Sequence, residues 1–291
     1  MNFYTLGFVI LETILVVATK YFFSLGIHPY FFVLFTGLSA SIILLIYLIV
    51  SNQIDKSFIK WSVIKTSLAT GVFASLANLI GFLGLKMTSV TNYAFLNRTN
   101  LLIIPILSWI ILKEKIKPII FPLAGLALIG VLLLTGDWRL MVNISGDSLA
   151  LLAAVAVSLD FIYQKKAVTK TFKDEVAFWR RLISAFLVGS IWLFTPELGQ
   201  AMWQYWPWMI LFSFGFAMIS VFLVRAVASQ PVAEFSLFSS IGPLLVALTA
   251  FFALNEKLNQ YQIAGGALIF GSIFIFNLIK KQESLKLKGK V

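Results

Sequence analysis

The sequence predicts an all-α integral membrane protein. Hydrophobic residues make up 60% of the chain and charged residues 12%, against roughly 45–50% and 25% in a soluble domain. The mean hydropathy is +0.95. Apolar runs of about 20 residues, the length that crosses a hydrocarbon core of about 30 Å as a helix, recur along the whole chain. These observations indicate several membrane helices joined by short connections, with no separate soluble domain.

Ten apolar runs have the length of a membrane span. They cover residues 3–25, 30–50, 64–85, 92–112, 117–135, 148–165, 176–195, 207–226, 233–254 and 260–279. The first run does not resemble a cleavable signal peptide, because Met1 and Asn2 supply no basic segment before it and Glu12 interrupts it. We therefore expect ten transmembrane helices.

The basic residues predict the orientation of these helices. With the N-terminus inside, the inner segments hold sixteen Lys and Arg residues and the outer loops hold three, namely Lys86, Arg139 and Lys257. The positive-inside rule then predicts a multi-pass protein of the cell membrane (plasma or inner membrane) with both termini in the cytoplasm. It also accounts for the net charge of +11, which in a soluble chain would suggest nucleic acid; no nucleic-acid partner is expected here.

Several kinds of chemistry are not expected. The chain has no cysteine, and its one histidine is His28, so a disulfide, a thiolate nucleophile or a His/Cys metal cluster cannot form. Neither a phosphate-binding P-loop nor a Gly-x-Ser-x-Gly elbow is present. We expect no enzyme activity, no metal, no cofactor and no ATP-driven step.

An internal repeat divides the chain in half. Residues 112–115 (LKEK) are similar to residues 254–257 (LNEK), 142 residues later, and the next run in each half contains Gly-x4-Gly. The glycines are Gly125 and Gly130 in the first half and Gly266 and Gly271 in the second, and we expect them to allow close helix packing. An odd number of helices per half, five, makes equivalent helices run in opposite directions, as in inverted repeats. The alternative is chance similarity between apolar segments.

This pattern resembles the EamA family of the drug/metabolite transporter superfamily. The resemblance rests on ten helices in two halves, on Pro105 and Pro243 in the fourth and ninth runs, and on a Glu-Lys pair that ends each of those runs. It implies two five-helix repeats, at residues 1–138 and 145–280, followed by a basic cytoplasmic tail at 281–291. It also implies alternating access around a central cavity. Pro105 lies 9 residues before Glu114 but Pro243 lies 13 before Glu256, so the halves differ near the cavity.

Arg98 is the residue whose predicted position within the membrane is energetically the least favourable. A guanidinium at the centre of a bilayer costs about 2.5–3.5 kcal/mol on insertion scales, so Arg98 must face a partner or a water-filled cavity. Asn97 and Asn100 stand beside it and add hydrogen-bonding groups. Two alternatives remain open: Arg98 binds a substrate carboxylate, or it forms a structural ion pair with Glu12.

The other candidates are polar groups at similar depth. We expect the substrate to contact a set that comprises Arg98, Asn97, Asn100, Asn78, Glu12 and Tyr93. A cation, a carboxylate and amides together complement a zwitterion, which favours an amino-acid-like solute. Asn78 could equally bond a neighbouring helix.

Four carboxylates are candidates for coupling or gating, namely Glu12, Asp160, Glu114 and Glu256. Glu12 or Asp160 could carry a proton, because burial penalises the charged form. For Asp160 the alternative is an ion pair with Lys165 or Lys166, and Arg180 and Arg181 could be anchors that reach the inner membrane surface. Glu114 and Glu256 each end a helix, where a structural role is the alternative.

The sequence thus predicts a secondary transporter of a small organic metabolite, with export the expected direction. Protons are a possible coupling partner, and the protein is expected to be a monomer or a homodimer in the lipid bilayer. Two alternatives stay open: a lipid-flipping protein, and a helper protein that transports nothing.

Overall fold

The computed structural model describes residues 2–54, 58, 61–88, 90–135, 144–169, 173–194, 204–245, 248 and 259–288. Every described element is a helix, as expected from the sequence. In the first half these are α1 (Phe3–Ser24), α2 (Pro29–Val50), α3 (Trp61–Met87), α4 (Val90–Asn97), α5 (Asn100–Leu107), the π-helix η1 (Ser108–Leu112) and α6 (Ile120–Thr135). In the second half they are α7 (Ile144–Val168), α8 (Lys173–Leu193), α9 (Trp206–Ser229), α10 (Val232–Ser239) and α12 (Gln260–Lys288), and residues 241–245 are also helical.

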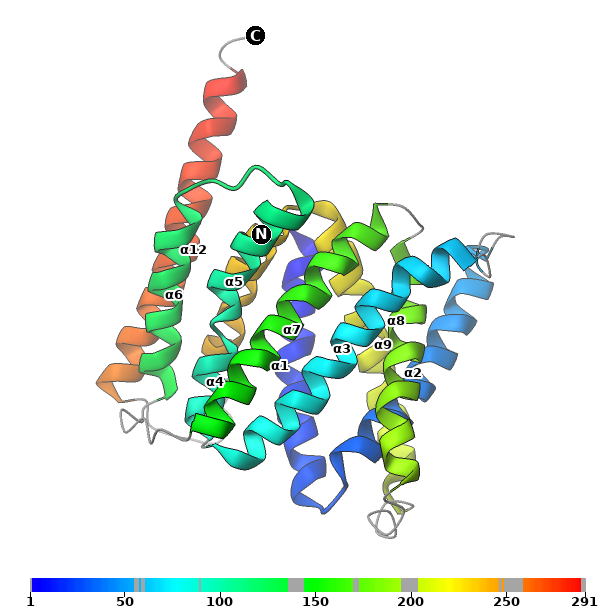
Figure 1. Cartoon of the computed structure of the whole chain (residues 1–291). Helices are drawn as coiled ribbons and strands as arrows, with labels where there is room; N and C mark the ends of the chain where they lie inside the picture. Colours follow the sequence, from blue (N-terminus) through cyan, green and yellow to red (C-terminus); the bar gives the residue numbers. More distant parts are fainter. Residues whose placement is uncertain are drawn as a thin grey trace.

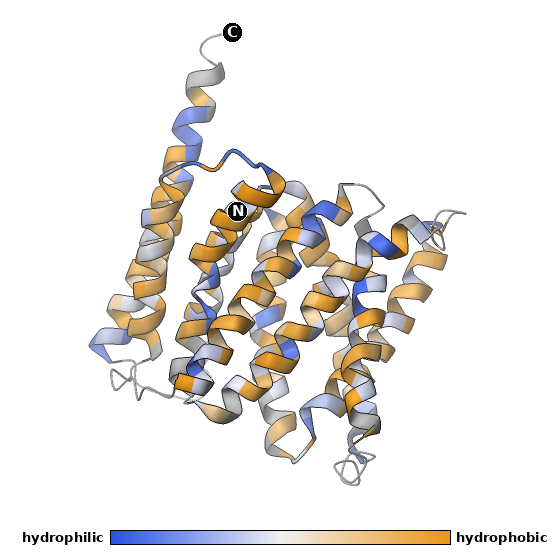
Figure 2. Cartoon of the chain, viewed as in Figure 1, coloured by the Kyte–Doolittle hydropathy of each residue, from blue (hydrophilic) through white to orange (hydrophobic). Residues whose placement is uncertain are grey.

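The helices are apolar around most of their circumference, and local signals set their ends. Pro29 occupies the first turn of α2, where its missing N–H costs nothing, and His28 Nδ1 accepts a hydrogen bond from Tyr30 N–H at 3.3 Å. Figure 2 shows apolar residues over most of the helical surface and polar residues concentrated near helix ends. Large side chains such as Ile42, Ile46 and Val50 are exposed on α2, as expected for a face in contact with lipid.

The helices form one bundle in which both described chain ends lie at the same side. α3 packs along α7, and α6 packs along α12 at one edge of the bundle (Figure 1). α1 starts, and α12 finishes, at the same end of the bundle, and the last turns of α12 project beyond it (Figure 1). The helix α12 continues without a break past residue 281 to Lys288, so eight residues of the predicted tail are helical.

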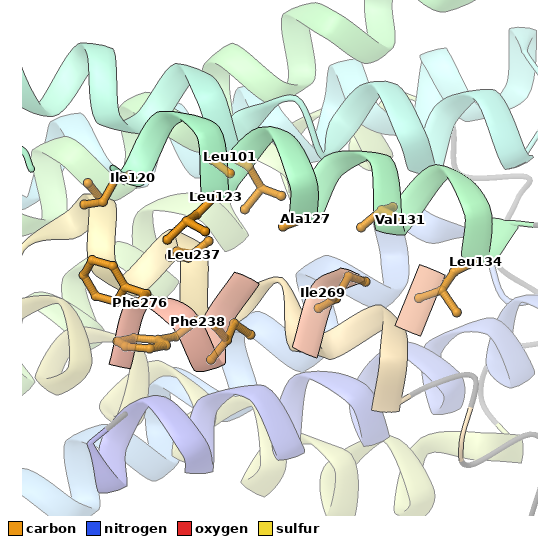
Figure 3. Packing of buried hydrophobic residues seen from close by; sticks show 13 residues of the cluster. Leu101, Ile120, Leu123, Ala127, Val131, Leu134, Leu237, Phe238, Ile269 and Phe276 are labelled. Carbon is orange, nitrogen blue, oxygen red and sulfur yellow. The ribbon is translucent and has the colours of Figure 1, made fainter. Parts of the chain in front are cut away.

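A hydrophobic core joins α6 and α12 to the middle of the bundle. Leu123, Ala127 and Val131 of α6 face Ile269 and Phe276 of α12 (Figure 3). Leu237 and Phe238 of α10 and Leu101 of α5 complete this cluster. α6 and α12 are therefore packed against α5 and α10.

Two glycines allow the α6–α12 contact. A Cβ at Gly130 would lie 2.7 Å from the carbonyl oxygen of Gly265, and one at Gly265 would lie 2.5 Å from that of Gly130. The expectation of close packing is thus confirmed for Gly130, but its partner is Gly265, the neighbour of Gly266. It is also confirmed for Gly266, where a Cβ would lie 2.8 Å from Leu244 Cδ1, whereas a Cβ at Gly125 or Gly271 would meet nothing within 4 Å among the described residues.

The fourth span is not one continuous α-helix, contrary to expectation. It comprises α4, α5 and η1, and the first interruption falls at Arg98 and Thr99 instead of at Pro105. Around it the N–H groups of Arg98, Thr99, Leu101 and Leu102 each bond the carbonyl three residues back, which tightens the turn. Pro105 removes the N–H that would bond the Leu101 carbonyl and lies about two turns after this interruption.

Six helical stretches in the described part are long and apolar enough to cross a membrane. They are Pro29–Val50, Val63–Gly84, Phe95–Leu112, Ile144–Val168, Trp206–Ser229 and Gln260–Glu283, and Phe3–Leu15, Ile120–Leu134 and Val232–Leu245 are shorter apolar stretches. α8 is not among them because its first nine residues include five charged ones, Lys173, Asp174, Glu175, Arg180 and Arg181. The total of ten spans remains a prediction.

Candidate functional site

Arg98 lies at the interruption of the fourth span, eight residues after Val90 (98 − 90 = 8), or about 12 Å from the start of α4. Its side chain is half-buried. The ion pairs between described residues are Lys117–Glu283, Arg180–Asp160, Arg225–Asp174 and Lys280–Glu234, so Arg98 takes part in none of them. Within the described part its guanidinium also has no hydrogen-bond acceptor. The structure therefore places, within the candidate span Phe95–Leu112, a cation whose donors have no acceptor among the described residues.

Tyr93 and Asn97 form a hydrogen-bonded pair one turn before this cation. Asn97 Nδ2 donates to Tyr93 Oη at 3.2 Å. The hydroxyl lies against α3, because a Cβ at Gly81 would be 2.5 Å from Tyr93 Oη. The absence of a side chain at Gly81 thus allows the tyrosine hydroxyl to approach the α3 backbone, and α4 is fixed to α3 next to Arg98.

Glu12, on α1, faces the interruption of the ninth span. A Cβ at Gly242 would lie 3.6 Å from Glu12 Oε2, so the carboxylate is next to the backbone just after Ser240. Oε2 is buried and has no hydrogen-bond partner among the described residues. Glu12 interacts electrostatically with Arg98, but the two side chains are not within the 4 Å of an ion pair. The structural ion pair between them is therefore not formed.

Asn100 and Asn78 lie on different helices. Asn100 is in the first turn of α5 and is 7% exposed, and Asn78 is in α3 and half-buried. No hydrogen bond joins either side chain to Arg98, Glu12 or Tyr93 in the described part of the chain. The structure thus brings Tyr93 together with Asn97 and places Glu12 within electrostatic range of Arg98, whereas Asn100 and Asn78 are not joined to these residues in the described part of the chain.

Asp160 has a partner that the sequence analysis did not identify. Arg180 Nε lies 3.0 and 3.2 Å from the two Asp160 oxygens, and Arg180 Nη2 lies 2.5 Å from Oδ2. The expected partner Lys165 instead donates to the carbonyls of Val227, Ala228 and Gln230 and satisfies the end of α9. The interpretation of Arg180 as a surface anchor is also wrong, because only 13% of its side chain is exposed.

Glu114 connects the two halves of the chain. Its Oε2 accepts hydrogen bonds from the Ser108 hydroxyl and from Val232 N–H at 3.1 Å, at the first residue of α10. A carboxylate at a helix N-terminus is favoured by the helix dipole. A hollow of about 630 Å³ lies beside Glu114 and is lined by Trp109, Ile110, Lys113, Lys115 and Ile116. Glu256, the equivalent residue in the second half, lies outside the described residues.

One feature of the sequence could have predicted the Asp160–Arg180 pair. Asp160 is eight residues before the end of α7 at Val168 (168 − 160 = 8), and Arg180 is seven residues after the start of α8 at Lys173 (180 − 173 = 7). Opposite charges at equal depth on consecutive helices can meet. Counting from the shared loop would have indicated the pair, although it gives no information on how the helices are rotated.

Comparisons with known proteins agree with this architecture. The model of the EamA-like transporter family matches twice, at residues 1–136 and 144–278. One crystal structure is similar over 96% of both chains with a TM-score of 0.78, and its 16% sequence identity supports the fold alone. A search of curated proteins gave no match. Because the family model covers nearly the whole chain, the protein belongs to the EamA-like transporter family and is a multi-pass membrane transporter of the drug/metabolite type.

Proposed function

We propose that the protein is a secondary transporter of a small, amino-acid-like metabolite, and that it exports this solute by alternating access. The solute would bind at Arg98, Asn97, Asn100, Asn78, Glu12 and Tyr93. The membrane would be the plasma or inner membrane of the cell, with both termini in the cytoplasm and the protein present as a monomer or a homodimer.

The observation that carries this proposal is the state of Arg98 and Glu12. Each is a charged group at membrane depth with unused hydrogen-bonding capacity, and the two are close enough to interact electrostatically without forming an ion pair. An intramembrane charge without a protein partner is costly unless a ligand or water supplies the partner. A zwitterion provides both partners at once, with its carboxylate on Arg98 and its ammonium group on Glu12.

Helix bounds in the two halves support ten spans in two inverted five-helix repeats. Adding 142 residues to α4 (Val90–Asn97) gives 232–239, the bounds of α10, and adding 142 to α1 gives 145–166, within α7. The interruptions also correspond, because α4 ends before Arg98 and α10 ends before Ser240, 142 residues later (240 − 98 = 142). Such paired, broken helices mark the binding site in many transporters with inverted repeats.

Contacts between the halves gather at the end of the bundle that holds both chain termini. Asn2 Nδ2 bonds Ser229 Oγ at 2.7 Å, Gln230 Nε2 bonds Thr5 Oγ1 at 2.8 Å, and Glu114 bonds the start of α10. We propose that these contacts form the inner gate and that they break when the solute site opens to the cytoplasm. Glu256 would have the equivalent role at the outer end.

Glu12 fits the role of proton carrier better than Asp160 does. Asp160 is held by three contacts from Arg180, whereas Glu12 Oε2 has no partner among the described residues. A carboxylate that changes its protonation in each cycle must be able to exist in both forms. We therefore assign coupling to Glu12, with a proton gradient as the driving force.

The proposal is tested with purified Arg98 variants and radiolabelled amino acids in proteoliposomes. Arg98→Gln should fold as well as the parent, because no protein partner loses its ion pair, yet binding should fall by about tenfold or more. Arg98→Lys should fail as well, because an ammonium group cannot make the planar two-point contact. Parental binding by well-folded Arg98→Gln, or lipid transfer without solute transport, would overturn the proposal.

A further inference from the structure

Two consecutive arginines in the middle of α8 have different surroundings. Successive residues of a helix point about 100° apart, so Arg180 and Arg181 face different neighbours. Arg180 pairs with Asp160 of α7. Arg181 points to α9, where its Nε donates to Ser220 Oγ at 2.8 Å and its guanidinium carbon lies 5.2 Å from the centre of the Phe216 ring.

This cluster lies well inside the bundle. Arg181 is eight residues after the start of α8 at Lys173 (181 − 173 = 8), or about 12 Å along the helix. Ser220 is nine residues before the end of α9 at Ser229 (229 − 220 = 9), or about 14 Å. Both therefore lie more than two helical turns from these helix ends, and the two side chains bond each other between α8 and α9.

Arg181 is the charge that the described neighbours do not balance. Asp160 uses both its oxygens on Arg180. Ser220 is neutral and donates its own proton to the Phe216 carbonyl at 2.7 Å, so it can only accept from Arg181. Glu175, six residues away in the first turn of α8, lies toward the helix end and has interactions of its own.

The contacts of Arg181 hold the guanidinium and leave its ends available. The Nε atom is bonded to Ser220 and one face of the guanidinium lies against the Phe216 ring. Both terminal amino groups have no acceptor in the described part of the chain. The residue is also half-buried, so part of it is not covered by the described neighbours. A planar fork of donors fixed in this way suits a carboxylate or a phosphate.

We infer that Arg181 is a second anion-binding residue on the transport pathway and that the solute carries a net negative charge, as an acidic amino acid does. This rests on the proposed function. Among the charges discussed at membrane depth, Glu12 offsets Arg98 and Asp160 offsets Arg180, which leaves one cation. A neutral zwitterion satisfies Arg98 and Glu12 but not Arg181, whereas a second acidic group balances it.

The first arm of the test needs no ligand. Arg181→Met and Arg180→Met are made in the full chain, and their melting temperatures are measured in detergent. Because an unbalanced buried cation destabilises the empty protein, Arg181→Met should melt at the parental temperature or higher. Arg180→Met leaves Asp160 uncompensated and should melt lower. A loss of stability in Arg181→Met as large as that in Arg180→Met would overturn the inference.

The second arm uses L-glutamate and L-glutamine, which have nearly the same shape but differ in charge. The parent should bind L-glutamate about tenfold more tightly than L-glutamine, and Arg181→Met should lose this preference while it still binds L-glutamine. Equal binding of the two by the parent, or a preference that survives in Arg181→Met, would overturn the inference and leave the proposed function intact. Binding of neither would overturn both.

Discussion

At the scale of single residues, the two membrane carboxylates Glu12 and Asp160 differ in what surrounds them. Glu12 has a buried oxygen without a partner among the described residues, and Asp160 has Arg180 on both oxygens. Burial favours the neutral form of a carboxyl group, and a bonded cation favours the charged form. Glu12 is therefore the better candidate for exchanging a proton during transport, whereas Asp160 holds α7 to α8.

Replacing Glu12 by Gln should remove the pH dependence of transport. The amide keeps the shape of the side chain but cannot bind or release a proton and no longer pairs with the solute ammonium group. Transport should therefore be slower, and the remaining rate should no longer change between about pH 5 and pH 8. The measurement is counterflow of the labelled solute in proteoliposomes at several pH values. An unchanged pH profile in a folded Glu12→Gln protein would move the coupling role to another residue.

Replacing Asp160 by Asn should chiefly affect stability. Asp160 and Arg180 have side chains that are 4% and 13% exposed, and breaking a buried pair from one side typically costs about 3–5 kcal/mol. A lower melting temperature and a lower yield are expected. Adding Arg180→Met should recover part of the loss, because the unpaired cation is then removed. If the single variant were as stable as the parent, the pair would not be structural.

At the scale of helices, Glu114 joins the end of the fourth span to the start of α10. Glu114→Ala removes the acceptor of Val232 N–H and should weaken the closed inner end by about 1–2 kcal/mol. Because the chain has no cysteine, Ser236→Cys, buried in α10, can report opening through maleimide labelling. The labelling rate should rise about 5–30-fold in Glu114→Ala.

Glu283→Ala is the control for this experiment. It removes the Lys117–Glu283 pair at the same end of the bundle, but both side chains are well exposed, at 32% and 49%. Exposed ion pairs contribute little, so labelling at Ser236→Cys should stay at the parental rate. Equal labelling in Glu114→Ala and Glu283→Ala would show that Glu114 does not close this end.

The glycines of α6 provide a second test with an internal control. Gly130→Ala places a methyl group 2.7 Å from the Gly265 carbonyl oxygen, so α6 and α12 must separate, at a cost of about 1–3 kcal/mol. Gly125→Ala meets nothing within 4 Å among the described residues and should keep or raise the melting temperature, because alanine favours helix. Equal melting temperatures for the two variants would contradict the contact.

Sequence patterns predicted the helices more fully than their contacts. The run at 30–50 coincides with α2 (Pro29–Val50) because uniform hydropathy fixes the location of a span. The interruption at Arg98 was not predicted, because the helix-breaking residue in this span is Pro105, seven residues later. The partner of Asp160 was missed because hydropathy gives depth but not rotation about the helix axis. Arg98 and Glu12 were identified because an intramembrane charge is expensive wherever it points.

At the scale of the whole molecule, basic residues lie at the same end of the bundle as the two chain ends. The first turn of α1 and the last turns of α12 lie at one end of the bundle, and α12 carries Lys280 and Lys281 there (Figure 1). Lys280 bonds Glu234 at 2.5 Å, and Lys165 satisfies the end of α9 at the same end. The basic residues thus serve the structure of this end as well as its orientation.

We expect this end to face the cytoplasm. Inner segments would then hold sixteen basic residues against three in the outer loops, and positive charge in short loops is retained on the cytoplasmic side of the membrane. The test fuses a reporter that is active only in the cytoplasm to Val291 or to Asp137, which follows the fifth predicted span. Activity is expected at Val291 and none at Asp137. With two inverted five-helix halves, the two positions must lie on opposite sides, so activity at both would contradict the odd number of spans per half, and activity at Asp137 alone would reverse the orientation.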